Sequence, residues 1–242
     1  MITKYGILGH NINEVGPSDG LVCWWKLDGD TLDYAGDCDL TNTGCTLSTG
    51  NGQMCYLTSS TSTYMRNTNL PSTVIGNNPI TLSCWFNLVS RPNTSNYNSF
   101  VWIGTENTKN CILSIGMNGG SVNITSAKYS NDLTSGISAV VGTWYHVVTT
   151  LDPNVAHKIY VNGVLKNTQG SPATNTRTNT ISIGCSASST AYYSNAYIQD
   201  VRIYNRILTD QEVSLLYNFG MGKPMITNNT VYCKNYSEVL NG

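Results

Sequence analysis

Charged residues are scarce in this sequence. Lys, Arg, Asp and Glu together make up 11% of the 242 residues, and the formal net charge is −1. Proteins that bind nucleic acid through its phosphates present a basic surface, which this composition cannot supply. We therefore expect no nucleic-acid partner.

Long apolar runs and a recognisable leader are also missing. No stretch is long and apolar enough to span a bilayer, and residues 1–10 lack the basic start and apolar run of a secretory signal. These absences predict a chain that is made without a secretory signal and does not insert into a membrane.

Motifs of common enzymes are absent as well. The few glutamates are scattered, so no carboxylate pair has the spacing used for glycoside hydrolysis, and there is no G-x-S-x-G, P-loop or G-x-G-x-x-G. His146 lies in an alternating apolar run, which favours a packed core side chain over a catalytic base. His10 and His157 have no nearby Ser, Cys or Asp arranged as a triad. We predict that the protein is not an enzyme.

Cysteine is present at eight positions, but without the spacing of a metal site. There is no C-x-x-C pair and no Cys/His cluster, so a zinc site is not expected. Cys23, Cys84 and Cys111 lie in apolar runs, where a thiol acts as a small hydrophobe. We expect mostly reduced thiols, with Cys38 and Cys45 as the pair best suited to a disulfide because both lie in a turn-rich segment.

Short alternating runs dominate the rest of the chain. Clusters of Gly, Asn, Ser and Pro separate them, which is typical of a β-sandwich. Asn162-Gly163 is a two-residue type I′ hairpin signal, and it predicts that Tyr160 pairs with Leu165.

One helix is well signalled, at about residues 210–218. Thr209 and Glu212 have the S/T-x-x-E spacing of a capping box, and Gly220 is placed to end the helix. The apolar positions of this segment fall on one helical face, as a packed helix requires: Val213, Leu216 and Tyr217. Before the helix, residues 201–206 alternate as expected of a strand with one buried face.

The junction of this strand and helix carries a resemblance to a known family. Residues 196–213 read AYIQDVRIYNRILTDQEV, which resembles the closing signature of the laminin-G-like, concanavalin A-like jelly rolls. Further blocks resemble the same family, in the order expected of it: residues 21–29 (LVCWWKLDG), 80–86 (ITLSCWF), 144–152 (WYHVVTTLD) and 158–165 (KIYVNGVL).

The resemblance implies an all-β fold. We expect an antiparallel β-sandwich of the concanavalin A-like jelly-roll type over residues 20–220, with one short C-terminal helix. The expected core includes eight residues: Trp85, Phe86, Trp144, Val148, Ile159, Val161, Val201 and Ile203. Residues 1–19 are expected to form an N-terminal arm, and residues 221–242 a C-terminal tail.

The arm has a mixed character. Its apolar side chains are too numerous for a solvated tail, yet its glycine-rich spacing cannot make a core of its own. We therefore expect residues 1–20 to dock onto a copy of the chain or onto another structural protein.

A group of aspartates lies within residues 28–39. Relatives of the family sometimes hold a structural calcium at this position, and the resemblance implies Asp33, Asp37 and Asp200 as metal ligands. Gln199 stands where the family often has a second acid, which lowers the charge of the ligand set. The alternative is that Asp33 and Asp37 accept hydrogen bonds from turn N–H groups. The sequence leaves both open.

Tyrosine and tryptophan rings offer candidate carbohydrate contacts. Rings expected in exposed loops are Tyr64, Tyr97, Trp102, Tyr192 and Tyr193, of which we single out Tyr192, Tyr193 and Trp102 as carbohydrate-binding residues. Such rings can stack on a pyranose face or cover a neighbouring strand, and the sequence does not separate the two.

These features favour a non-catalytic structural protein on the surface of a virion or phage particle, serving as a decoration, fibre or adhesion module. The alternatives are a carbohydrate-binding lectin or adhesin module of a cell-surface protein, and an accessory domain of a glycan-active enzyme. Surface glycans are expected partners in each case. The expected location is a particle surface, or the cell surface or extracellular space under the alternatives.

Overall fold

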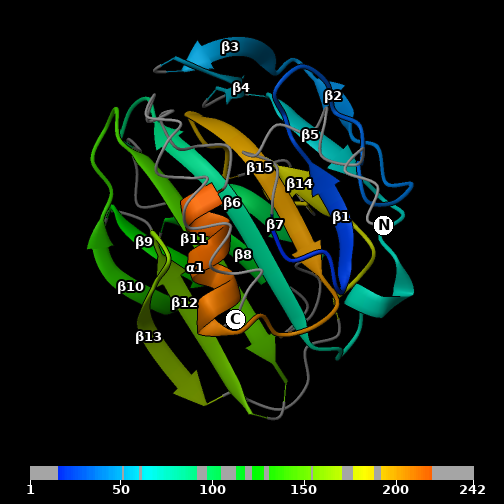
Figure 1. Cartoon of the computed structure of the whole chain (residues 1–242). Helices are drawn as coiled ribbons and strands as arrows, with labels where there is room; N and C mark the ends of the chain where they lie inside the picture. Colours follow the sequence, from blue (N-terminus) through cyan, green and yellow to red (C-terminus); the bar gives the residue numbers. More distant parts are fainter. Residues whose placement is uncertain are drawn as a thin grey trace, which may run out of the picture.

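The computed structural model describes residues 16–219, except residues 51, 60–61, 92–96, 105–112, 118–121, 128–130, 154, 171–176 and 188–191. Most of the predicted arm and all of the predicted tail therefore lie outside the described residues. Two antiparallel sheets face each other, and one helix lies outside them (Figure 1). The predicted all-β sandwich with a single short C-terminal helix is confirmed for the described part of the chain.

Sheet A has eight strands. Its order is β13-β12-β11-β6-β15-β4-β3, and β1 also pairs with β15. The strands are β1 (Leu21–Trp25), β3 (Thr46–Gly50), β4 (Gln53–Thr58), β6 (Ile80–Leu88), β11 (Trp144–Asp152), β12 (Ala156–Val161), β13 (Val164–Gly170) and β15 (Ala196–Tyr204).

Sheet B has seven strands, in the order β10-β9-β8-β7-β14-β5-β2. The strands are β2 (Thr41–Thr43), β5 (Tyr64–Asn67), β7 (Asn98–Ile103), β8 (Leu113–Met117), β9 (Asn123–Ala127), β10 (Leu133–Ser138) and β14 (Ile181–Ile183). A single 3₁₀ turn, η3 (Ser72–Val74), follows β5 among the described residues.

The main core fills the space between the sheets. Phe86 of β6 stacks on Phe100 of β7, with ring centroids 4.0 Å apart, and on Tyr145 of β11 at 5.6 Å. Of the eight residues expected in the sandwich core, five belong to it: Phe86, Ile159, Val161, Val201 and Ile203. Trp85 and Val148 are buried on the outer face of sheet A instead, and Trp144, on the same face opposite Asn87, is only partly buried.

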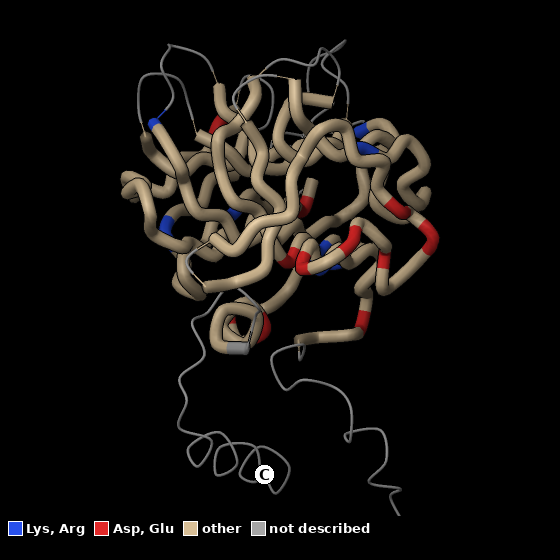
Figure 2. The backbone as a smooth tube through the Cα atoms, turned by 90° about the horizontal axis from the view of Figure 1, so that it is seen from above, with Lys and Arg blue, Asp and Glu red and all other residues tan. Residues whose placement is uncertain are grey.

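A second apolar cluster lies between sheet A and the helix α1 (Asp210–Phe219), which covers the outer face of the sheet (Figure 2). Its members are Val148, Tyr160, Tyr204, Leu208, Val213 and Leu216. Tyr217 extends the contact by stacking on Trp85. The alternation of residues 201–206 predicts one buried face, which leaves Arg202 and Tyr204 on the solvent face. Because α1 covers that face, both residues are buried.

The start of α1 and the turn of the β12–β13 hairpin form as their sequences predict, whereas Gly220, predicted to end the helix, lies outside the described residues. Glu212 N–H donates to Thr209 Oγ1 at 3.2 Å, and Thr209 N–H donates to Glu212 Oε2 at 2.8 Å, which completes the capping box. Asn162 and Gly163 take φ values of 52° and 77°, as a type I′ turn requires, and Tyr160 pairs with Leu165.

The cysteines differ from one expectation. Cys38 and Cys45 are buried free thiols, so the suggested disulfide between them is wrong. Cys38 Sγ instead donates to the Asn69 carbonyl at 3.3 Å. The other described cysteines, at positions 23, 55, 84 and 185, are also free and buried, in line with the predicted reduced thiols.

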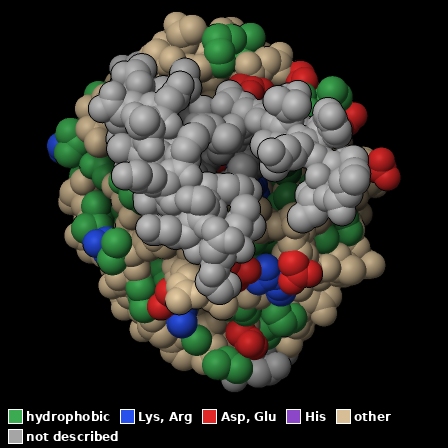
Figure 3. Space-filling view, in the orientation of Figure 1, with side chains coloured by type: hydrophobic (Ala, Val, Ile, Leu, Met, Phe, Trp, Pro, Cys, Tyr) green, Lys and Arg blue, Asp and Glu red, His purple; other side chains and the backbone are tan. Residues whose placement is uncertain are grey.

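Charges are sparse on the surface too. On the part of the front face that Figure 3 colours by residue type, acidic and basic side chains are scattered among uncharged ones, and some of opposite sign lie side by side below the centre of the view. Among the described residues, no helix has the length and apolar character needed to cross a membrane.

Candidate functional site

One row of side chains crosses the outer face of sheet B. Residues directly opposite each other on antiparallel strands share a face, and the register pairs Arg66 of β5 with Ser182 of β14, and Ser182 with Trp102 of β7. Trp102 in turn pairs with Ser114 of β8. We call these four residues the outer row; Ser114, Ser182 and Trp102 are buried, and Arg66 is partly exposed. Their sequence neighbours point into the main core: Met65, Val101, Ile103, Ile115, Ile181 and Ile183.

Three aromatic rings gather around Trp102 of the outer row, away from its Arg66 end. Tyr192 stacks on Trp102, with ring centroids 6.0 Å apart and planes inclined by 23°. Tyr97 meets Tyr192 edge-on at 6.1 Å. Trp102 is 3% exposed and its Nε1 donates to the Gly104 carbonyl at 3.0 Å, whereas Tyr192 is only partly buried. We call these three rings the ring cluster, of which Tyr97 and Tyr192 present accessible surface.

The backbone holds Tyr192 in an uncommon conformation. Its φ is 55°, in the left-handed region that bulky residues avoid. The Tyr192 carbonyl accepts a hydrogen bond from Ser99 N–H at 2.9 Å, which ties this loop to β7. Backbone conformations of this kind persist where surrounding contacts enforce them, and they gather at ligand-binding sites.

Tyr97 is fixed by its hydroxyl group. That hydroxyl donates to the carboxylate of Asp132. Burial and the neighbouring Asp132 carboxylate raise the pKa of Tyr97 well above its usual range. The phenol therefore stays protonated, and its ring keeps its place beside Tyr192.

The other end of the outer row opens into a shallow pocket of about 300 Å³. The Arg66 guanidinium lies 4.5 Å from the centre of the Tyr64 ring and donates to the Ser186 carbonyl at 3.0 Å. It also donates to Ser182 Oγ at 3.4 Å. The pocket is lined by hydroxyl, amide and guanidinium groups: Thr41, Thr43, Tyr64, Arg66, Asn67, Thr68 and Asn69.

These positions revise the sequence-based interpretation of the rings. Trp102 lies within β7 and is buried, so its expected place in an exposed loop is wrong. The structure brings Trp102 and Tyr192 together. Tyr193, the next residue after Tyr192, is partly buried. Arg66 was missed by sequence reasoning because only strand pairing places it on the same face as Trp102.

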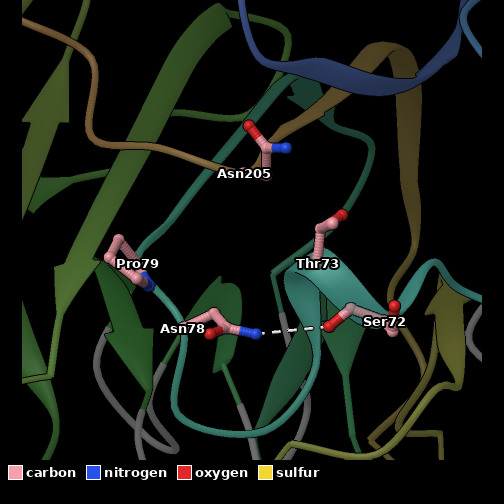
Figure 4. A pocket seen from close by; sticks show the side chains of 5 residues that line it. All are labelled: Ser72, Thr73, Asn78, Pro79 and Asn205. Atoms are coloured by element: carbon pink, nitrogen blue, oxygen red, sulfur yellow. Dashed lines mark hydrogen bonds between the residues drawn. The ribbon is translucent and has the colours of Figure 1, made fainter.

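A second pocket, of about 370 Å³, lies between η3 and the end of β15 (Figure 4). Asn78 Nδ2 donates to the carbonyls of Ser72 and Ile75, at 3.2 and 2.9 Å. Its lining residues offer hydroxyl and amide groups but no aromatic ring: Ser72, Thr73, Asn78, Pro79 and Asn205. It therefore lacks the surface for ring stacking that the outer row has.

Both described histidines are enclosed. His146 is 1% exposed, as predicted for a packed side chain, and burial lowers its pKa to about 3. His157 is fully buried and its Nε2 lies 2.8 Å from Ser126 Oγ. The strand arrangement thus brings a serine to His157 that the sequence did not predict. Neither His146 nor His157 has the accessible surface that a catalytic histidine needs.

Asp33 bonds the backbone of its own turn. Its carboxylate accepts N–H groups from Trp24 at 2.8 Å, Ala35 at 3.0 Å and Cys38 at 3.1 Å. This is the alternative role considered for Asp33, as an acceptor of backbone hydrogen bonds.

Asp200 has different partners. Its two oxygens accept hydrogen bonds from Arg202, at 2.7 and 3.1 Å, and from Trp24 Nε1 at 2.7 Å. Asp37 is exposed. Within the described residues, the ligand atoms that cluster with Asp33 belong to Cys23 and Cys38 and not to these two aspartates. A calcium ion at Asp33, Asp37 and Asp200 stays a prediction.

The sandwich topology and the polar, ring-bearing outer row define a lectin-like β-sandwich protein. Comparison with known families agrees: the model of the concanavalin A-like lectin/glucanases superfamily matches residues 59–214, more than half of the chain. The chain belongs to this superfamily. A search of curated proteins finds no match.

Solved structures share the fold at low sequence identity. Domain 4 of AbnA, a GH43 extracellular arabinanase from Geobacillus stearothermophilus in complex with arabinotriose, is 19% identical, with a TM-score of 0.61 over 81% of this chain and 98% of that one. The binding domain of Paraclostridial Mosquitocidal Protein 1 is 16% identical, with a TM-score of 0.68 over 88% of this chain and 57% of that one.

A structure of botulinum neurotoxin type C, whose cell entry depends on interaction with two ganglioside molecules, is also 16% identical, with a TM-score of 0.63. The two chains are covered to 87% and 56%, so this chain spans little more than half of either toxin structure.

Proposed function

We propose that this chain is a non-catalytic glycan-binding module that uses the outer face of sheet B. The observation that carries the proposal is Tyr192, held with φ at 55° so that its ring stacks on Trp102 beside the polar outer row. A sugar has an apolar C–H face and a rim of hydroxyl groups. A partly exposed ring on the same sheet face as a pocket of guanidinium and amide groups suits both surfaces.

The outer row sets the size of the ligand. Neighbouring strands lie about 4.8 Å apart, so the backbones of Arg66 and Trp102, two strands apart, are separated by about 10 Å. This distance exceeds one pyranose ring. We therefore expect an oligosaccharide, with one ring on Tyr192 and hydroxyl groups of a neighbouring ring at the Arg66 pocket.

Proteins of the same fold add support through the glycans that they bind. The arabinanase domain was solved in complex with arabinotriose, and the type C neurotoxin interacts with gangliosides. We place the module on the outside of a cell or particle, where such glycans are found. Its predicted role as a virion or phage surface protein stays a prediction, because the arm expected to anchor it lies largely outside the described residues.

The test is a glycan array with the full chain, followed by calorimetry on the strongest oligosaccharide. Tyr192→Ala should weaken binding about tenfold or more, equivalent to 1.4 kcal/mol. Tyr192→Phe should bind as the parent does, because the ring remains. Tyr34→Ala removes an exposed tyrosine near β1 and is the matched control. The proposal is overturned if no glycan binds, or if Tyr192→Ala and Tyr34→Ala bind equally well.

A further inference from the structure

Two thiols and one carboxylate meet beneath strand β1. The ligand atoms of Cys23, Asp33 and Cys38 all lie within 4.8 Å of one another. All three residues are buried, with exposed fractions of 0%, 9% and 4%. Such a grouping of sulfur and oxygen donors matches the ligand types of zinc sites.

The surrounding backbone holds this group in place. Asp33 forms an isolated bridge with Trp25, and Tyr34 N–H donates to the Trp24 carbonyl at 2.8 Å. Trp25 Nε1 donates to the Cys38 carbonyl at 2.8 Å. Residues 33–38 are thereby folded back onto β1. These contacts hold the side chains of Asp33 and Cys38 close to Cys23.

Gly36 packs closely against the carboxylate. A Cβ atom on Gly36 would lie 3.0 Å from Asp33 Oδ2 and 2.8 Å from the Val22 carbonyl oxygen. Any residue other than glycine at position 36 would therefore crowd Asp33 and displace it from its place beside the two thiols.

The three donor atoms would have to move closer together to bind one ion. Zinc binds sulfur at about 2.3 Å and carboxylate oxygen at about 2.0–2.2 Å, which places neighbouring ligands about 3.5 Å apart. The three N–H groups that Asp33 accepts orient its carboxylate in the way outer hydrogen bonds support a metal ligand.

Binding a divalent ion here would not leave an uncompensated buried charge. Cys23 and Cys38 are free thiols in this fold. A divalent cation would displace one proton from each thiol and form two metal–sulfur bonds. Because two positive charges replace two protons, the net charge of the buried group does not change.

We propose that Cys23, Asp33 and Cys38 form a binding site for a thiophilic divalent cation, with Zn²⁺ as the best match. Sulfur ligands select zinc over calcium, which takes oxygen ligands alone. The site therefore differs in metal and in ligands from the calcium site predicted from the sequence.

The experiment uses the full chain, stripped with a chelator and then dialysed against Zn²⁺. Mass spectrometry of the metal should find zinc bound, and Co²⁺ in its place should produce the near-ultraviolet absorption of a thiolate–cobalt bond. Cys23→Ser and Cys38→Ser should each lower the affinity more than about a hundredfold, since loss of mere supporting contacts costs 10–100-fold. Cys84→Ser, another fully buried cysteine, is the matched control and should keep the zinc.

Several results would overturn the proposal. One is a parent protein that binds no zinc, and another is Cys23→Ser protein that retains it. Should both serine variants fail to fold, the cobalt spectrum of the parent decides, because it reports thiolate ligation without any substitution. An intact mass two hydrogens below that of the reduced chain, with Cys23 and Cys38 resistant to alkylation, would assign the pair to a disulfide instead.

Discussion

Glu212 joins the last strand to the helix. Its carboxylate accepts hydrogen bonds from Arg206 Nη1 and Nη2, at 2.9 and 2.6 Å, and from Thr209 N–H at 2.8 Å. The bonds from Arg206 lower the pKa of Glu212 to about 2, against the opposing effect of burial. Since the pKa is about 4.3 in an unfolded chain, the ionised group stabilises the fold above that pH.

Replacing Glu212 with Gln keeps an acceptor for the capping box but removes the charge that pairs with Arg206, so it should cost about 1 kcal/mol at pH 7. The difference from the parent should shrink as the pH falls from about 4.3 towards 2, because the parent then loses the same charge. Urea unfolding at pH 7, 4 and 2 measures it, with Gln211→Ala, exposed on the same turn, as the control. An unchanged difference at pH 2 would contradict this account.

The calcium prediction is also decided by single residues. If Asp33, Asp37 and Asp200 bind calcium, chelation should lower the melting temperature, since a ligand at a hundredfold excess over its Kd stabilises by about 2.7 kcal/mol. Asp200→Asn also removes the ion pair with Arg202, so it lowers stability in any case. The informative readout is whether Asp200→Asn abolishes the response to chelator. Identical melting curves for the parent with chelator and with millimolar calcium would reject the site.

At the scale of elements, the β12–β13 hairpin and α1 depend on each other. Gly163 has a φ of 77°, and a Cβ atom added to it would lie 3.0 Å from Tyr217 Cβ. Gly142 has a φ of 80° with nothing within 4 Å of an added Cβ. Both positions carry backbone strain for any residue with a side chain, but only Gly163 also contacts the helix.

Gly163→Ala should therefore destabilise the protein more than Gly142→Ala. Each should lose about 1 kcal/mol through its backbone, and Gly163→Ala should lose more as the helix is displaced. Guanidinium unfolding measures the free energy of unfolding of each variant, and the difference between the two losses gives the contribution of the helix contact. Equal losses would show that α1 moves away from the hairpin without cost.

At the scale of the whole molecule, the first described residues pack against the sandwich. A Cβ atom on Gly16 would lie 2.4 Å from Arg202 Nη1, so the chain packs tightly there. The Asp19 carboxylate pairs with Arg206 at 2.9 Å, and the Gly20 carbonyl accepts Asn205 N–H at 2.9 Å. Residues 16–19, assigned to the arm by the sequence, thus contact the sandwich.

Deleting residues 1–15 should then leave a domain that melts cooperatively at nearly the parent temperature. Deleting residues 1–19 should lower that temperature further, because the contacts of Gly16 and Asp19 are lost. Calorimetry measures the melting temperature of both truncated chains. Light scattering shows whether the chain without residues 1–19 still forms the assembly predicted for residues 1–20. A truncated chain that assembles normally, or that does not fold, would contradict the anchoring role.

The sequence alone determined those features that depend on local chemistry. The capping box at Thr209 and Glu212, the positive φ of Asn162 and Gly163, and the alternation that makes strands are set by residues within a few positions of one another. Their physical causes are short-range hydrogen bonds and backbone sterics. Similar blocks in the right order were enough to predict the sandwich.

Only the tertiary structure decided what covers each strand and which side chains meet. Arg202 alternates as a solvent-facing residue does, but α1 lies over its strand and it is buried against Asp200. Strand pairing sets Arg66 beside Ser182 and Trp102 across three strands. A turn folded onto β1 brings Cys38 to Cys23, which no zinc spacing in the sequence predicted. Such contacts depend on how β-sheets pair and stack between residues far apart in the chain, which a local pattern does not encode.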